Sequence, residues 1–271
     1  MIDNKVLVGY APTRRRIFSV EDALKYKKMI ADKLKTLNVE FVDIEDVNEE
    51  GLLRCAEDVD KVIDKFRIAK VDALFIPHCN FGSEHSCAKV ARALNVPTLL
   101  WGPRDEAPLA DGSRLRDSQC GLFATGKVLR RMQVPFTYLP NCRVEDDLFA
   151  EGLKRFVAAA NVVKEFRRAR ILQIDTRPGD FWTMMCNEGE LLEKFGIQLF
   201  PINMIELVDR VKKLVDSDDA EVTRTVNWIK DNMEVCVSEG DVRSVAALKT
   251  AMKYFAAENH CNAIAIQCWD A

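Results

Sequence analysis

The amino-acid sequence predicts an α/β protein built from two tandem, doubly wound parallel-sheet domains of the Rossmann-like type. Short apolar runs alternate strictly with longer amphipathic stretches, which is the pattern of parallel strands joined by crossover helices. The alternation restarts near residue 168, so we expect one domain over residues 1–168 and a second over 169–271. The last apolar run, residues 263–267, lies almost at the end of the sequence. The second domain is therefore expected to be incomplete at its C-terminus, because in such sheets the loop after the strand builds the site.

The first domain is expected to contain five strands, each a short apolar run that a glycine, a proline or a polar loop ends, at residues 5–10, 39–44, 72–77, 97–101 and 135–139. Helices are expected at residues 19–37, 50–69, 83–94, 120–132 and 145–167. Ser19 and Asp22 have the spacing of a capping box, and Ser83 is placed to cap the third helix. The second domain is expected to have strands at 170–175, 197–202 and 263–267 and helices at 188–195, 204–215, 220–232 and 240–258.

Composition and charge exclude several classes of protein. The formal net charge of −3 provides no basic surface for nucleic acid, and no segment approaches the roughly 20 consecutive apolar residues of a membrane span. The first residues show no basic segment followed by an apolar core, so no secretory signal is expected. The nine cysteines include no Cys-x-x-Cys pair, which favours reduced thiols in a cytoplasmic protein. We therefore expect neither nucleic acid nor a membrane as a partner.

Residues 121–127 resemble the first seven positions of a phosphate-binding P-loop. The motif needs a Ser or Thr next to hold Mg²⁺, and Val128 stands there instead. A P-loop also follows a buried strand, whereas a polar segment precedes Gly121. We therefore interpret this segment as a glycine-bearing helix packed on the sheet. No Gly-x-Gly-x-x-Gly fingerprint follows Tyr10, which argues against a dinucleotide site.

His78, Cys79, His85 and Cys87 gather around one strand-to-helix loop. Their residue types suit zinc, but the spacing lacks the paired knuckles of a structural zinc site, and adjacent side chains point in different directions. We therefore expect no zinc here.

Polar side chains follow the first, third and fourth strands, where each strand ends. Arg14, Arg15 and Arg16 follow the first strand, Asn80 lies after the third, and residues 101–106 follow the fourth. The carboxyl ends of parallel strands meet at one edge of the sheet, so these loops are expected to converge on one ligand site. For the arginines, a solvated turn is the alternative interpretation.

The loop after the third strand also has a purely structural interpretation. Ser83 would cap the following helix and Glu84 would interact with the helix dipole. That interpretation does not account for His78 or Asn80. In the second domain, residues 175–182 and the end of the last strand, Gln267 and Trp269, are candidates to line a second cleft. For Trp182 and Trp269, packing in a core or domain interface is the favoured interpretation.

Several stretches in order along the chain resemble one enzyme group, namely residues 13–16, 77–84, 101–106, 174–188, 203–207 and 263–269. Together they are similar to the L-fucose isomerase and L-arabinose isomerase group, especially its fucose isomerase-like branch. The resemblance implies a metal-dependent aldose–ketose isomerase with two α/β domains followed by a mostly β domain. That third domain is absent from residues 1–271.

The resemblance implies chemistry through an enediolate that a divalent metal, usually Mn²⁺, stabilises while acidic groups move a proton between C1 and C2. The metal carboxylates and a histidine of the family correspond to positions beyond residue 271. The resemblance therefore implies no catalytic and no metal-binding residue within this chain, and the chain alone is expected to be inactive. The partners it implies are a small aldose or ketose and further copies of the chain in a homo-oligomer.

Individual residues acquire expected roles from the resemblance. The expected substrate-binding residues are Arg15, Arg16, Asn80, Gln267 and Trp269. A loop with His78, Cys79, Ser83 and Glu84 is expected to reach the pocket of a neighbouring subunit. Fucose isomerases place a tryptophan where Cys79 stands, so the resemblance does not identify the sugar.

A non-catalytic, cytosolic, two-lobed sugar-binding module is the alternative function. Two tandem α/β units with a cleft also describe sugar-binding proteins. A reading frame that continues beyond residue 271 into acidic ligands and a histidine would favour the enzyme over this module.

Overall fold

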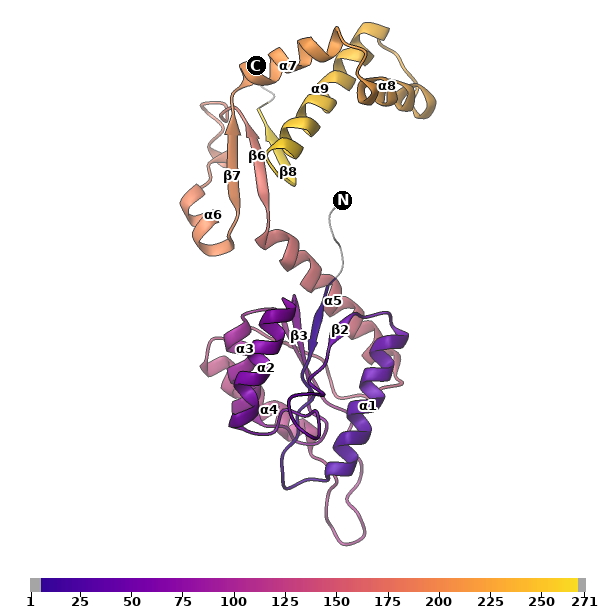
Figure 1. Ribbon diagram of the computed structural model, residues 1–271, viewed down its shortest axis with the longest axis vertical. Coiled ribbons are helices and arrows are strands. Elements are labelled where there is room, and N and C mark those ends of the chain that lie inside the picture. Colours follow the sequence, from indigo (N-terminus) through magenta and orange to yellow (C-terminus); the bar gives the residue numbers. More distant parts are fainter. Residues whose placement is uncertain (1–5, 268–271) are drawn as a thin grey trace. The chain divides into compact units, whose positions relative to one another are not determined.

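The computed structural model describes residues 6–267, and the chain forms two compact units, Met1–Lys164 and Glu165–Ala271 (Figure 1). The sequence places this boundary after residue 168. Helix α5, Asp147–Arg167, runs across the boundary between the units. Each unit contains a parallel sheet with its own hydrophobic core, so the prediction of an α/β protein with Rossmann-like sheets is confirmed.

The first unit is a five-stranded parallel sheet in the order β2-β1-β3-β4-β5. Its strands are β1 Val8–Tyr10, β2 Phe41–Val42, β3 Ala73–Pro77, β4 Thr98–Trp101 and β5 Thr137–Tyr138. The helices beside α5 are α1 Val20–Thr36, α2 Ala56–Ala69, α3 Glu84–Leu94 and α4 Ser118–Arg131. This order is that of the flavodoxin-like doubly wound fold, in which the chain winds away in opposite directions from a point between the first and third strands.

Both faces of the first sheet are covered, which explains why its strands are apolar throughout (Figure 1). On one face, Phe75 packs with residues of α1 and α5, such as Ile30 and Phe149. On the other, Leu74 and Ile76 pack with residues of α2, α3 and α4. Successive side chains of a strand point to opposite faces, so a single strand supplies both cores.

The helix predicted at residues 50–69 begins six residues later, at Ala56, so that part of the prediction is wrong. Gly51 has a φ of +59°, which a helix does not accommodate, and Leu53 pairs as an isolated bridge with Thr13. The first turn of α2 is instead set by Asp58, whose carboxylate accepts a hydrogen bond from the backbone N–H of Arg54 at 3.0 Å.

Both predicted helix caps lie where the sequence places them, but their side chains act differently. The Ser19 hydroxyl accepts a hydrogen bond from the Asp22 backbone N–H at 3.1 Å. The Asp22 carboxylate does not complete a capping box, because it pairs with the buried guanidinium of Arg116 at 2.7 Å. Ser83 is the N-cap residue of α3, but its hydroxyl donates to the Ser86 hydroxyl at 3.0 Å instead of accepting from the backbone.

The second unit has a three-stranded parallel sheet in the order β7-β6-β8. Its strands are β6 Arg170–Ile174, β7 Gln198–Ile202 and β8 Ala263–Ile266, and its helices are α6 Glu188–Phe195, α7 Met204–Val215, α8 Ala220–Asn232 and α9 Glu239–Glu258. Leu172 and Ile174 of β6 pack on one face against residues such as Leu207 of α7 and Ala247 of α9. Every residue of β8 is exposed in this structure.

Candidate functional site

The order of the first sheet reverses between β1 and β3, and α/β sheets bind ligands at the carboxyl side of such a position. The two loops that leave this position are residues 11–19 after β1 and residues 78–83 after β3. They contain the arginines and the asparagine that the sequence predicts to converge. The convergence of these two loops is therefore confirmed, and it follows from the parallel direction of the strands.

Thr13 connects the two loops. Its backbone N–H donates to the Pro77 carbonyl at 2.9 Å, and its carbonyl accepts from the Cys79 N–H at 3.0 Å. The Thr13 hydroxyl accepts from the Ser83 N–H at 2.9 Å and donates to the Leu53 carbonyl at 2.7 Å. Thr13 is fully buried, so these bonds are shielded from water and hold the loops in one arrangement.

Asn80 is fully buried, and its amide binds the loop after β1. Its Oδ1 accepts from the Arg15 backbone N–H at 2.8 Å, and its Nδ2 donates to the carbonyls of Arg15 and Ser19 at 3.3 and 3.2 Å. Asn80 therefore positions the backbone of Arg15. The contact between Asn80 and a substrate, which the resemblance implies, stays a prediction.

The three consecutive arginines point to different partners. Arg14 is 8% exposed and binds both carboxylate oxygens of Glu50 at 2.6 Å, so it has a structural role. The guanidinium of Arg15 lies 4.5 Å from the centroid of the Phe81 ring and is partly exposed. Arg16 is exposed to solvent. Arg15 and Arg16 thus remain accessible to a ligand. Three consecutive side chains point in different directions, so all three arginines cannot serve one site.

Further contacts hold the Arg15 side chain in place. Its Nε donates to the Gly82 carbonyl at 3.2 Å, and its Nη2 lies 3.9 Å from a carboxylate oxygen of Glu84. The Phe81 ring under the guanidinium stacks on Phe18 of the other loop, with the ring centroids 5.5 Å apart. The sequence reasoning missed this aromatic pair. Phe18 lies near Arg15 in the loop after β1, and Phe81 lies in the loop after β3. One phenylalanine in each of two converging loops, beside an arginine, is the sequence signal that would have identified the pair.

His78 and Cys79 are fully buried beneath the loop. Burial lowers the pKa of His78 to about 4 and raises the pKa of the Cys79 thiol, so both side chains are neutral near pH 7. The His78 Nε2 lies 2.9 Å from the Thr125 hydroxyl of α4. A methyl group in place of the Gly82 hydrogen would lie 2.4 Å from the His78 ring, and Gly82 has a φ of +82°, so this turn requires glycine.

The four residues considered for zinc are not arranged as a ligand set. Cys79 packs in the core on one face of the sheet and Cys87 in the core on the other face. His78 is buried, whereas His85 is exposed. Within residues 6–267, no three His, Cys, Asp or Glu side chains form a group that could hold a metal ion.

The P-loop-like segment lies in helix α4, as its interpretation as a packed helix predicts. A Cβ on Gly121 would lie 1.7 Å from the Phe81 carbonyl oxygen. The glycine therefore allows α4 to approach the loop that carries Asn80. Its role here is close packing rather than a turn around phosphate.

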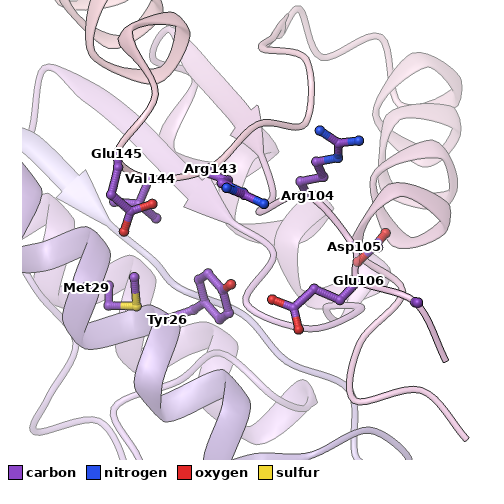
Figure 2. A pocket seen from close by; sticks show the side chains of 9 residues that line it. Tyr26, Met29, Arg104, Asp105, Glu106, Arg143, Val144 and Glu145 are labelled. Atoms are coloured by element: carbon purple, nitrogen blue, oxygen red, sulfur yellow. The ribbon is translucent and has the colours of Figure 1, made fainter. Parts of the chain in front are cut away.

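The loop after β4 lines a pocket of its own in the first unit. This pocket has a volume of about 490 Å³, and its lining includes Arg104, Asp105 and Glu106 from the loop and Tyr26 from α1 (Figure 2). Asp105 also caps α4, since its carboxylate accepts from the backbone N–H groups of Ser118 and Gln119 at 2.8 and 3.0 Å.

Gln267 lies in the second unit at the end of β8. It lines a pocket of about 740 Å³ at the carboxyl end of β6, together with Asp175, Thr176 and Arg177. This pocket is the second cleft that the sequence predicts. Trp182 is 72% exposed, so core packing does not account for it here. The predicted role of Trp269 falls outside the described residues.

The fold and these loops define an α/β protein in which the loops after β1 and β3 meet at the carboxyl edge of the first sheet. A family model described as the N-terminal domain of fucose/sulfoquinovose isomerases matches residues 9–167, more than half of the chain. The chain belongs to this family, and the predicted fucose isomerase-like resemblance is confirmed.

Two curated relatives share low sequence identity with the chain. The sulfoquinovose isomerase of Alkalicoccus urumqiensis is 21% identical over 262 residues, which cover 97% of this chain and 56% of the relative. The sulfoquinovose isomerase of Clostridium sp. strain MSTE9 is 23% identical over 198 residues, which cover 72% of this chain and 43% of the relative. The chain thus spans about half the length of these relatives.

Among solved structures, a periplasmic solute-binding protein of an ABC transporter from Actinobacillus succinogenes 130z, with bound D-allose, is similar at 12% identity. The match covers 97% of this chain and 77% of that protein. Its TM-score of 0.26 is too low to support an argument about fold or ligand. No helix within residues 6–267 has both the length and the apolar character to cross a membrane.

Proposed function

We propose that this chain is the N-terminal part of a sugar ketol-isomerase that interconverts an aldose and a ketose through an enediolate. The family match to residues 9–167 is the observation that carries this proposal. The relatives are named for sulfoquinovose, a sugar with an anionic sulfonate group. We therefore propose a sulfonated or similarly anionic aldose as the substrate.

The loops at the carboxyl edge of the first sheet support this choice of substrate. Arg15 is held by Phe81, by the Gly82 carbonyl and, through its backbone, by Asn80. A guanidinium positioned in this way loses little side-chain entropy when it binds an oxyanion. Arg16 adds a second, exposed cation next to it.

In the proposed reaction, this chain binds and orients the sugar. Arg15 and Arg16 donate to sugar or sulfonate oxygens, and the amide of Gln267 bonds to a hydroxyl at the cleft of the second unit. The divalent metal that the resemblance implies, expected to be Mn²⁺, finds no ligand group within residues 6–267. Its ligands would come from outside these residues.

The assembly of the complete protein is part of the same proposal. We propose a cytoplasmic homo-oligomer in which the loop of residues 78–84 reaches the pocket of a neighbouring subunit through Glu84, because His78 and Cys79 are buried within their own unit. Glu84 and Ser83 belong to the start of α3, a rigid element on which such a contact is well defined.

The decisive experiment measures conversion of sulfoquinovose, L-fucose and D-glucose to their ketoses by the complete protein with added Mn²⁺. The preferred sugar is expected to be converted, and Arg15→Gln is expected to lower kcat/KM by about 10- to 100-fold through the loss of a charge-assisted hydrogen bond. Arg92→Gln, an exposed arginine of α3, is the matched control and is expected to keep wild-type kinetics. Binding of a sugar without any conversion would instead favour the sugar-binding module.

A second pair of variants tests the cleft of the second unit. Gln267→Ala is expected to cost about 1–3 kcal/mol of transition-state binding, because a buried sugar hydroxyl would lose its partner. Gln198→Ala is the control variant, because it removes a glutamine side chain from an exposed position at the opposite end of the same sheet. Equal kcat/KM values for the two variants would show that Gln267 does not contact the sugar.

A further inference from the structure

The sheet of the second unit has one face that is largely uncovered. Side chains of a strand alternate between the two faces, so Leu172 and Ile174 of β6 lie on the face that α7 and α9 cover. Ile171 lies on the opposite face, and the strand register places Leu199 of β7 and Ala263 of β8 beside it. On that face α6 packs beside β7 (Figure 1), whereas every residue of β8 is exposed.

The pocket of about 740 Å³ at Gln267 extends over this uncovered face as an apolar groove. Its floor and its wall include six apolar side chains from the sheet and from the segment between β6 and α6, namely Ile171, Leu199, Ala265, Phe181, Met184 and Met185. The two methionines are 65% and 58% exposed. The polar residues Asp175, Thr176 and Gln267 lie at the carboxyl end of the strands, away from the floor at Ile171 and Leu199. Apolar surface gathered in this way is typical of a face that another element covers.

The first unit indicates which element covers such a face. Its strand order β2-β1-β3 recurs as β7-β6-β8, so β8 is the counterpart of β3, and α6 is the counterpart of α1. Right-handed crossovers place α1 and α6 on corresponding faces of their sheets. Beside α1, helix α5 covers β3, with the ring centroids of Phe149 in α5 and Phe75 in β3 6.3 Å apart. In the second unit, no helix among residues 6–267 takes the place of α5.

The relatives show that proteins of this family contain further chain that could supply the missing helix. The matched residues make up 56% of one relative and 43% of the other, so each has a long segment that this chain does not match. In the first unit, α5 follows β5, the last strand of its sheet. The equivalent helix of the second unit would follow strands added at the edge of β8, where β4 lies beside β3 in the first sheet.

We propose that a helix of the complete protein, from outside residues 1–271, packs in this groove as α5 packs on the first sheet. The helix is amphipathic, and its apolar face covers Ile171, Leu199, Met184 and Met185. It fills the apolar part of the groove and leaves the polar end at Gln267 open to a ligand. A second copy of this chain is the alternative occupant. The inference does not rest on the proposed isomerase activity, because it concerns packing alone.

Oxidation of methionines by hydrogen peroxide, without any sugar present, tests whether the groove is filled. In the complete protein, Met184 and Met185 are expected to oxidise at least about tenfold more slowly than in urea, because a covered sulfur reacts slowly. In the 271-residue chain, both are expected to oxidise almost as fast as in urea, as is Met233, an internal control that is 55% exposed. Fast oxidation of Met184 and Met185 in the complete protein would overturn the proposal. Equal protection in the 271-residue chain would also overturn it, because that chain lacks the proposed helix.

Photo-crosslinking of the complete protein identifies the occupant. Ala265→p-benzoylphenylalanine places the crosslinker on the floor of the groove, and the same substitution at Leu192, an exposed residue of α6, is the control. The crosslinker at Ala265 is expected to join a peptide from outside residues 1–271 of the same chain, and the control is not. Mixtures of isotope-labelled and unlabelled chains distinguish links within a chain from links between chains. A link between chains would assign the groove to a second copy and overturn the proposal, as would links confined to residues 1–271. Absence of isomerase activity would leave both experiments unaffected.

Discussion

Replacing Gly121 with alanine tests how closely α4 packs against the loop that carries Asn80. The added Cβ would lie 1.7 Å from the Phe81 carbonyl oxygen, whereas real Cβ contacts are essentially never shorter than 3.0 Å. Helix and loop must therefore separate by about 1.3 Å. The loop cannot move freely, because Asn80 and Thr13 are fully buried and hydrogen-bonded.

Two opposing contributions determine the size of the effect. Alanine stabilises a helix interior by about 1 kcal/mol relative to glycine. Overpacking a rigid core costs about 1–3 kcal/mol, and a collision with backbone falls at the upper end of that range. We expect Gly121→Ala to lower the free energy of unfolding of the first unit by about 2 kcal/mol, which corresponds to a decrease in Tm of about 4–8 °C for a unit of this size.

Gly126→Ala in the same helix is the matched control. Its Cβ would lie 3.2 Å from the outer edge of the partly buried Phe136 ring, which can move. This variant is expected to be neutral or stabilised by up to about 1 kcal/mol. Urea unfolding followed by tryptophan fluorescence, to which the buried Trp101 contributes, measures both variants. A Gly121→Ala protein as stable as the wild type would refute the close approach of α4 to the loop.

Three further predictions concern buried charge and activity. Burial lowers the folded-state pKa of His78 to about 4, below the ordinary 6.5, so the unfolded chain binds a proton at this histidine first as the pH falls. Neutral His78 therefore contributes about 3 kcal/mol to the free energy of unfolding above pH 6.5, and this contribution is lost as the pH falls towards 4. Urea midpoints across this range should flatten for His78→Gln relative to wild type but not for the exposed His85→Gln. Asp22→Asn removes the closest carboxylate of the buried Arg116 guanidinium, which is 3% exposed, and is expected to lower the free energy of unfolding by about 3–5 kcal/mol. Asp32→Asn, on the exposed side of the same helix, is the control and should change the urea midpoint little. The 271-residue chain alone is expected to convert no aldose even with Mn²⁺; product formation that disappears on addition of a chelator would contradict this.

The convergence of the Arg15 and Asn80 loops could be anticipated from the sequence, because both follow buried strands and parallel strands end at one edge. The function of Asn80 could not be anticipated in the same way. The sequence places an amide side chain at the carboxyl edge of the sheet, but it does not show that this amide is hydrogen-bonded to the backbone of Arg15 and Ser19. Likewise, the separation of Cys79 and Cys87 onto opposite faces depends on how β3 leads into α3.

The sequence by itself determined the order and type of most elements, since strand and helix periods are local properties that neighbouring residues carry. The helices α6, α7 and α8 begin and end where the sequence predicts. Only the tertiary structure decided which distant residues meet, such as Arg116 with Asp22, 94 positions apart. The alternation of strands and helices does not specify the strand order β2-β1-β3-β4-β5, and this order brings Tyr26 of α1 to the loops after β4 and β5. The candidate sites therefore depend on long-range packing, which local patterns do not encode.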